Sequence, residues 1–140
     1  MSVALTACGC SVPTASMGAS VRLVDLSAIP ASAHEQAMRL AIAEARGNPA
    51  FPFGAVILRT ADRHVMATGV NKSAANPTLH GEIVAINDYV AHHGNRSWDE
   101  AILYTTGEPC PMCMSAMVWA GMGVWARRSS NCANSASTRS

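Results

Sequence analysis

Apolar residues recur at helical spacing between Ser32 and Arg46. Ser32 and Glu35 form the Ser-x-x-Glu pattern of a capping box, which predicts a helix start at Ser32. Residues 47–49, Gly-Asn-Pro, supply the stop signal. The expected buried positions of this helix are Ala37, Leu40, Ala41 and Ala45.

Three apolar runs rich in strand-forming residues lie further along the chain. Residues 53–58 and 64–70 flank the tetrapeptide 60–63, and this arrangement predicts a β-hairpin. Residues 101–106 predict a third strand, and a short fourth strand is expected to begin at Val124.

Two further helices are expected between and after these strands. The first has Thr78 as its expected N-cap and ends at Gly94. The second covers residues 111–120, which are apolar nearly all round, and this predicts burial on most sides. The expected buried stripe of the first of these helices consists of Leu79, Ile83, Ile86 and Val90.

This order of elements predicts an α/β fold with helices on both faces of a central sheet, a three-layer α/β/α sandwich. The predicted domain spans residues 32–126. Residues 1–31 are expected to be a flexible leader or the remnant of an export signal, because the Ser, Ala, Thr and Pro residues at 11–20 bury little surface. Residues 127–140 lack apolar periodicity and are expected to form an irregular tail.

The composition fits one compact, soluble domain. The 140 residues are 49% hydrophobic and 14% charged, and the formal net charge is +1. Sparse, balanced charge disfavours binding of long nucleic acids, which needs clustered cations, and favours small uncharged substrates. No apolar run reaches the roughly 18–20 residues of a membrane-spanning helix, so no transmembrane segment is expected.

The first residues leave two compartments open. Residues 5–8, Leu-Thr-Ala-Cys, are similar to the end of a bacterial lipoprotein signal, in which Cys8 would be lipidated. The preceding stretch is short and contains no basic residue. A cytoplasmic location is therefore favoured, and export through Cys8 is the alternative if the natural N-terminus is longer.

Residues 110–113, Cys-Pro-Met-Cys, place two thiols within reach of one soft metal ion at the expected start of a helix. His80 offers a third ligand from the start of the preceding helix. Three protein ligands leave one position of a tetrahedral zinc ion open, as in catalytic rather than structural sites. The positive N-terminal end of a helix also lowers thiol pKa values, which favours thiolate ligands.

Glu82 lies two residues after His80 and is expected to move protons rather than bind the metal. His-x-Glu followed by Pro-Cys-x-x-Cys is the signature of zinc deaminases, so we expect one Zn²⁺ per chain, held by His80, Cys110 and Cys113. Two other interpretations remain open. Cys110 and Cys113 would serve a redox protein as a dithiol, and a non-catalytic zinc fold would bind the metal without turnover.

The residues from 32 to about 125 resemble the cytidine deaminase-like superfamily, within the branch of guanine deaminases and tRNA adenosine deaminases. The landmarks are residues 51–56, Phe-Pro-Phe-Gly-Ala-Val, together with 76–82 and 103–113. The resemblance implies a mixed sheet and assembly as a homodimer. It also implies a zinc-bound hydroxide that attacks the amino-bearing ring carbon and releases ammonia.

The resemblance further implies the residues that bind the substrate. Asn71 would hydrogen-bond the substrate ring or ribose, although as a loop residue it is equally a turn former. The residues expected to line the base pocket are Phe53, Gly54, Ala55 and Val56. A free nucleobase or nucleoside, with a guanine-type purine favoured, is the expected substrate, and tRNA is the less favoured alternative because only Lys72 offers a cation near the pocket.

Two features depart from the family pattern. Gly81 stands where most relatives carry Ala, which removes a methyl group beside the ring. The family continues after the third helix with further strands and helices, whereas this sequence continues with the irregular tail. The sheet is therefore expected to be truncated at its C-terminal strands, and an inactive zinc-binding remnant is a further alternative.

Overall fold

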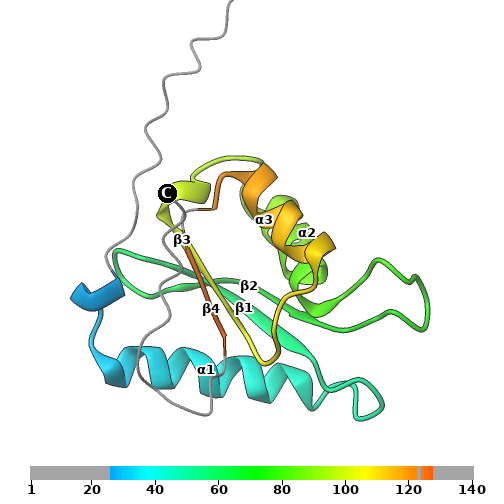
Figure 1. Ribbon diagram of the computed structural model, residues 1–140. Helices are drawn as coiled ribbons and strands as arrows, with labels where there is room; N and C mark the ends of the chain where they lie inside the picture. The colour runs from blue at the N-terminus through cyan, green and yellow to red at the C-terminus, as the bar shows by residue number, and fades with distance from the viewer. Residues whose placement is uncertain (1–25, 123, 128–140) are drawn as a thin grey trace, which may run out of the picture.

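The computed structural model describes residues 26–122 and 124–127, and Figure 1 shows a central sheet between helices. Two short 3₁₀ helices, Leu26–Ala28 and Trp98–Glu100, precede α1 and β3. The regular elements are α1 (Ala31–Ala45), β1 (Gly54–Arg59), β2 (Val65–Val70), α2 (Gly81–His93), β3 (Ala101–Thr105), α3 (Pro111–Ala120) and β4 (Val124–Arg127). The predicted strands and helices are all present, and their ends differ from the predicted ones by at most three residues.

The four strands form a mixed sheet in the order β2-β1-β3-β4. β1 pairs antiparallel with both β2 and β3, and β3 pairs parallel with β4. The register places Gly54 opposite Val70 and Ala55 opposite Thr105, so the start of β1 lies beside the ends of β2 and β3. α2 begins 11 residues after the end of β2, and α3 begins 6 residues after the end of β3.

Helices cover both faces of the sheet, which confirms the expected three-layer α/β/α sandwich (Figure 1). Strand residues alternate between the two faces, and so they build two separate cores. The core on the α1 face consists of Ala37, Ala41, Val56, Leu58, Ile102 and Tyr104. The core on the α2 and α3 face consists of Ala55, Ile57, Ala67, Ala85, Tyr89, Trp98, Ala101, Leu103, Met117 and Met122.

Two glycines allow helices to approach the sheet closely. A Cβ atom on Gly54 would collide with the backbone of α1 at Ala41 and Ala45. A Cβ atom on Gly69 would collide with the backbone of α2 at Gly81 and Ala85. Gly69 therefore allows the first turn of α2 to lie close to the sheet. Glu82 is in that turn, and His80 is the N-cap just before it.

Side chains of α2 also bind the outer edge of β2. The Thr68 N–H donates to Asp88 Oδ2 at 3.1 Å, and His93 Nε2 lies 2.9 Å from the Met66 carbonyl oxygen. The carbonyl can only accept, so His93 donates from Nε2. Both contacts occupy backbone groups that an edge strand otherwise leaves open, and they anchor α2 to the sheet.

The predicted start of the first helix is wrong. α1 begins at Ala31 with Pro30 as N-cap and without a side-chain capping bond. The Pro30 carbonyl accepts the N–H of Ala33 at 2.9 Å, so Ser32 is already inside the helix, and Glu35 instead pairs with Arg39 at 2.6 Å. Ordered structure also begins before the predicted boundary at residue 32, because Leu26 and Ile29 pack against the α1 core.

The expected buried stripe of α2 is wrong in phase. α2 begins at Gly81 with His80 as N-cap, and Thr78 instead lies in a loop where its hydroxyl donates to Asn76. The helix packs on the sheet through its Gly and Ala positions, while Val90 is 40% exposed. The buried residues of α2 are Gly81, Glu82, Ala85 and Tyr89.

α3 is buried on one side, not on most sides as its composition predicted. Cys113 and Met117 are buried one helical turn apart, whereas Val118 and Trp119 are 68% and 89% exposed. The expected burial of residues 111–120 on most sides therefore fails at Trp119, because none of the described helices and strands covers that side of α3. Leu40 of α1 is likewise 39% exposed.

None of the helices in the described ranges is both long and apolar enough to cross a membrane. Cys8, Cys132 and most of the expected leader and tail lie outside the described residues.

Candidate metal centre

His80, Cys110 and Cys113 form a cluster where α2 and α3 begin. The Cys110 Sγ atom lies 3.5 Å from His80 Nδ1 and 3.6 Å from Cys113 Sγ. The possible ligand atoms of the three residues all lie within 4.8 Å of one another. The structure thus brings together the three predicted metal ligands from two helices.

The spacing of these atoms fits a zinc ion. Bonds of about 2.3 Å to sulfur and about 2.0–2.1 Å to nitrogen in a tetrahedron separate the ligand atoms by about 3.5–3.8 Å. The two separations that involve Cys110 Sγ, 3.5 Å to His80 Nδ1 and 3.6 Å to Cys113 Sγ, agree with this requirement. The donor set of one imidazole and two thiols is also one that zinc prefers.

Helix N-termini place the ligands. His80 and Cys110 are the N-cap residues of α2 and α3, both in extended conformation, and Pro111 occupies the first turn of α3. Proline suits this position because its missing N–H would have no helical partner there. The His80 and Cys110 carbonyls accept the first helical hydrogen bonds, at 2.9 Å from Val84 N and Met114 N, which leaves both side chains outside the helical ladder.

The predicted lowering of the thiol pKa values is wrong for Cys113. This thiol is fully buried, and burial raises its pKa well above the usual value. The nearby Glu82 carboxyl and Cys110 thiol raise the pKa further through charge and hydrogen bonding. Burial therefore outweighs the helix end, and a divalent cation bound between the sulfurs would supply the positive charge that a thiolate needs here.

Glu82 is the buried carboxyl group beside the cluster. It lies in the first turn of α2 and is only 5% exposed. The Thr105 hydroxyl donates to Glu82 Oε1 at 2.9 Å. Sequence reasoning predicted the place of Glu82 but missed Thr105, because no spacing motif links a residue at the end of a strand to a helix that precedes it in the chain.

Asn71 and Phe53 lie at the same edge of the sheet. Asn71 is 6% exposed, its Oδ1 accepts the N–H and hydroxyl of Ser73 at 2.9 and 2.7 Å, and its own N–H donates to the Phe53 carbonyl. Asn71 therefore makes the turn that its residue type favours. Its contact with a substrate remains a prediction.

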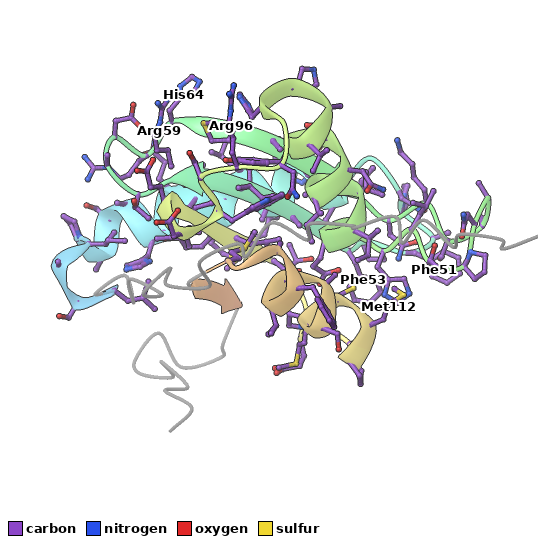
Figure 2. The ribbon with its side chains drawn as sticks, turned by 90° about the horizontal axis from the view of Figure 1, so that it is seen from above. Phe51, Phe53, Arg59, His64, Arg96 and Met112 are labelled. Atoms are coloured by element: carbon purple, nitrogen blue, oxygen red, sulfur yellow. The ribbon has the colours of Figure 1, made fainter. Side chains whose placement is uncertain are left out.

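The predicted pocket residues of β1 face different sides of the sheet. Phe53 is 47% exposed, whereas Ala55 packs in the core under α2 and Val56 packs in the core under α1. Gly54 lies against α1. Only Phe53 of these four residues presents a large accessible side chain, and in the view of Figure 2 it lies on the same side of the molecule as Phe51 and Met112.

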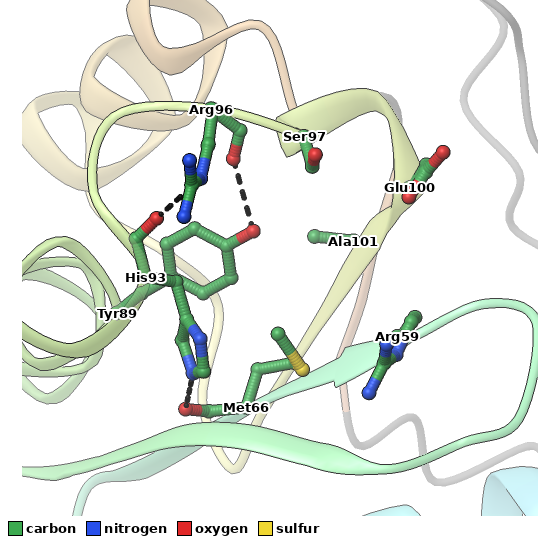
Figure 3. A pocket seen from close by; sticks show the side chains of 8 residues that line it. All are labelled: Arg59, Met66, Tyr89, His93, Arg96, Ser97, Glu100 and Ala101. Atoms are coloured by element: carbon green, nitrogen blue, oxygen red, sulfur yellow. Dashed lines mark hydrogen bonds between the residues drawn. The ribbon is translucent and has the colours of Figure 1, made fainter.

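A small cavity lies away from the metal cluster. It has a volume of about 140 Å³ and opens between the far ends of β1 and α2 (Figure 3). Figure 2 shows two of its residues, Arg59 and Arg96, at the opposite end of the molecule from Phe53. The cavity is lined by Arg59, Met66, Tyr89, His93, Arg96, Ser97, Glu100 and Ala101.

An α/β/α domain with one histidine and two cysteines at adjacent helix starts, and a buried glutamate beside them, defines the class of zinc deaminase domains. Residues 31–126 match the family described as the cytidine and deoxycytidylate deaminase zinc-binding region. The chain belongs to this family. The match favours a metal-binding role of Cys110 and Cys113 over a redox dithiol.

Known relatives include enzymes with different substrates. The chain is 44% identical over 71 residues to the guanine deaminase of Bacillus subtilis (strain 168), which covers 49% of this chain and 44% of that protein. It is 33% identical over 102 residues to a tRNA-specific adenosine deaminase of Haemophilus influenzae. This alignment covers 68% of this chain and 57% of that enzyme. The chain thus spans about half the length of these relatives.

A solved structure of guanine deaminase from Bacillus subtilis has a similar fold. The TM-score is 0.60 at 35% sequence identity, and the alignment covers 68% of this chain and 63% of that chain. The similarity confirms the cytidine deaminase-like fold class that the sequence predicted.

Proposed function

We propose that the chain is a zinc-dependent hydrolytic deaminase of a free nucleobase or nucleoside, with a guanine-type purine favoured. In this reaction water adds to the ring carbon that carries the amino group, a C–O bond forms and the C–N bond breaks. The products are the carbonyl form of the base and ammonia. The observation that carries the proposal is the buried Glu82 carboxyl beside the His80, Cys110 and Cys113 cluster.

The residues have separate roles. His80, Cys110 and Cys113 hold one zinc ion per chain, which supplies the activation of a water molecule for attack on the ring. Glu82 accepts a proton from this water and delivers protons to the ring nitrogen and the departing amine. Burial of Glu82 keeps bulk water from competing for these protons.

The favoured substrate is small and uncharged. The half-exposed Phe53 ring offers a stacking surface for a purine at the edge of the sheet where the cluster lies, and Asn71 offers a carboxamide for its polar edge. Lys72 is the one Lys or Arg among residues 71–80, which lead to His80. The greater identity to guanine deaminase, 44% against 33%, supports the same choice.

A tRNA adenosine deaminase is the second candidate. The observation that favours it is the longer alignment with the Haemophilus influenzae enzyme, over 102 residues rather than 71. Recognition of an anticodon loop needs cations and stacking side chains around the pocket. Among the residues whose burial is described, the exposed aromatic side chains that could stack are Phe51, Phe53 and Trp119.

Ammonia release distinguishes these candidates. The zinc-loaded chain is assayed with guanine, cytosine, adenine, their nucleosides and a tRNA, with Glu82→Gln as the inactive control. We expect turnover of guanine at a kcat/KM at least tenfold above that of the others. Turnover of tRNA alone would support the second candidate, and zinc binding without turnover of any substrate would identify a non-catalytic remnant.

We also propose a homodimer in the cytoplasm. The exposed Val118 and Trp119 form an apolar surface on α3 that association would remove from water. The two thiols at the cluster suit a reducing compartment. Sedimentation of the purified chain, with Trp119→Ser as the comparison, tests the dimer: a monomer at all concentrations for both proteins would contradict it.

A further inference from the structure

The hydroxyl of Thr105 contacts one oxygen of the proposed proton-transfer group. Thr105 is the last residue of β3 and is 1% exposed, and its Oγ1 donates to Glu82 Oε1 at 2.9 Å. The direction of this bond is fixed when the carboxylate is ionised, because it then only accepts. The two residues are 23 positions apart, so the contact exists only in the folded domain.

The sheet holds the Thr105 side chain in place. Thr105 pairs with Ala55 of β1, and its alternation with Ala101 and Leu103 directs it to the face covered by α2. A threonine side chain in a strand has few χ1 rotamers because its Cβ is branched. The hydroxyl therefore presents a nearly fixed donor to α2.

The Glu82 carboxyl is also close to the metal cluster. Cys113 is fully buried, and the nearby Glu82 carboxyl raises the pKa of its thiol. Glu82 is thus near both Thr105 and Cys113. A carboxylate has two oxygens, and a donor on Oε1 leaves Oε2 for another partner.

We propose that Thr105 is a positioning residue, whose hydroxyl fixes Glu82 Oε1 so that Oε2 is the oxygen that exchanges protons with water and substrate. The inference rests on the proton-transfer role proposed for Glu82. Thr105 touches neither substrate nor metal in this assignment. It determines the orientation of the carboxylate, which proton transfer requires within hydrogen-bond reach.

The primary test is Thr105→Val, which removes the hydroxyl and keeps the branched shape. Loss of an outer hydrogen-bond partner at metal sites costs about 10–100-fold in affinity or activity. We expect kcat to fall by about 10–100-fold, while KM changes by less than about threefold and zinc content is unchanged. Thr68→Val makes the same exchange on β2, where Thr68 pairs with Val56 of the core on the α1 face, and is expected to retain wild-type kcat.

A second pair of variants distinguishes loss of the hydroxyl from loss of side-chain packing. Thr105→Ser and Thr105→Ala both lose the methyl group, but only serine keeps the hydroxyl. We expect Thr105→Ser to retain kcat within about fivefold of wild type and Thr105→Ala to fall as far as Thr105→Val. Equal kcat values for the serine and alanine variants would overturn the proposal.

A double-mutant cycle provides a readout apart from activity. Urea unfolding of Thr105→Val, Glu82→Ala and the double variant measures the coupling between the two side chains. We expect a coupling of about tenfold in the unfolding equilibrium constant, because a buried acceptor loses its hydrogen-bond donor. Additive effects would show that the hydrogen bond contributes nothing and would overturn the proposal.

The variants also separate this inference from the one on which it rests. Full activity of Thr105→Val together with an inactive Glu82→Gln would refute the positioning role and leave the role of Glu82 intact. Full activity of Glu82→Gln would refute the proton-transfer role and, with it, the positioning role.

Discussion

His80 Nδ1 and Cys110 Sγ lie 3.5 Å apart, although 30 positions separate the two residues along the chain. One residue caps α2 and the other caps α3, so this contact joins the starts of two helices on one face of the sheet. A metal ion held between them would bind the folded state and not the unfolded chain. Its binding free energy would then add to the stability of the fold.

Replacement of one thiol ligand is expected to remove the metal. Cys113→Ser exchanges a fully buried sulfur for a harder oxygen, which zinc binds less tightly in this donor set. We expect zinc affinity to fall by more than the about 10–100-fold that loss of an outer partner costs. Metal analysis after dialysis measures this, with Cys132→Ser as the control that keeps about one zinc per chain. Equal zinc content in both variants would remove Cys113 from the ligand set.

Glu82→Gln is expected to separate metal binding from catalysis. Glutamine keeps the size of the side chain and an oxygen that accepts the Thr105 hydroxyl, but it does not take up a proton. Zinc content should therefore stay at the wild-type level while kcat falls by about 10²–10⁴-fold. Single-turnover ammonia release with guanine measures the chemical step, and a decrease below tenfold would argue against general base catalysis by Glu82.

Much of the site could be predicted because it depends on short spacings. His80 and Glu82 are two residues apart, and Cys110 and Cys113 are three apart at a helix start, so local geometry alone brings each pair together. The prediction that His80 lies close to the two cysteines was also correct, because both helices begin at the same edge of the sheet. The family and the three-layer order followed from the same elements.

The contacts that the sequence did not reveal are tertiary. Thr105 reaches Glu82 from a strand that follows α2 in the chain, and no periodic pattern marks such a pair. The apolar composition of residues 111–120 predicted burial on most sides, yet Trp119 is exposed, because burial depends on which elements cover the helix. The capping box at Ser32 failed because α1 already begins at Ala31, with Pro30 as its N-cap. Local rules correctly predicted that the three candidate ligand residues lie together, and they predicted the buried faces of the helices poorly.

Gly69→Ala is expected to destabilise the domain. The added Cβ would meet the α2 backbone at Gly81 and Ala85, and backbone moves less easily than the end of a side chain. We expect the free energy of unfolding to fall by about 1–3 kcal/mol. Gly107→Ala is the matched control, because its added carbon would meet only ring atoms of the half-exposed Phe53 at 3.1 and 3.3 Å. Urea denaturation compares the two, and an equal loss for both would contradict the close approach of β2 and α2.

The two tyrosines of the chain make its stability sensitive to high pH. Burial raises the pKa of Tyr104 to about 12, and burial with the Glu100 charge also raises the pKa of Tyr89. An unfolded tyrosine ionises near pH 10, so the folded state keeps the phenol proton more tightly than the unfolded state. The resulting contribution to stability is complete below about pH 10 and is lost as the pH rises towards about 12.

Comparison of the wild type with Tyr104→Phe tests this contribution, because other groups that titrate at alkaline pH are the same in both proteins. The Tyr104 hydroxyl lies 2.8 Å from His34 Nδ1, and His34 Nε2 lies 3.2 Å from the Leu26 carbonyl, which only accepts. In a neutral ring Nε2 therefore carries the proton, and Nδ1 accepts from Tyr104.

Loss of the Tyr104–His34 hydrogen bond should lower the free energy of unfolding at pH 8 by about 0.5–1.5 kcal/mol. At pH 11 the wild type has lost part of the Tyr104 contribution and the variant has not, so the two urea midpoints should converge between pH 8 and pH 11. A constant difference between the midpoints at both pH values would show that Tyr104 ionises equally in the folded and unfolded states.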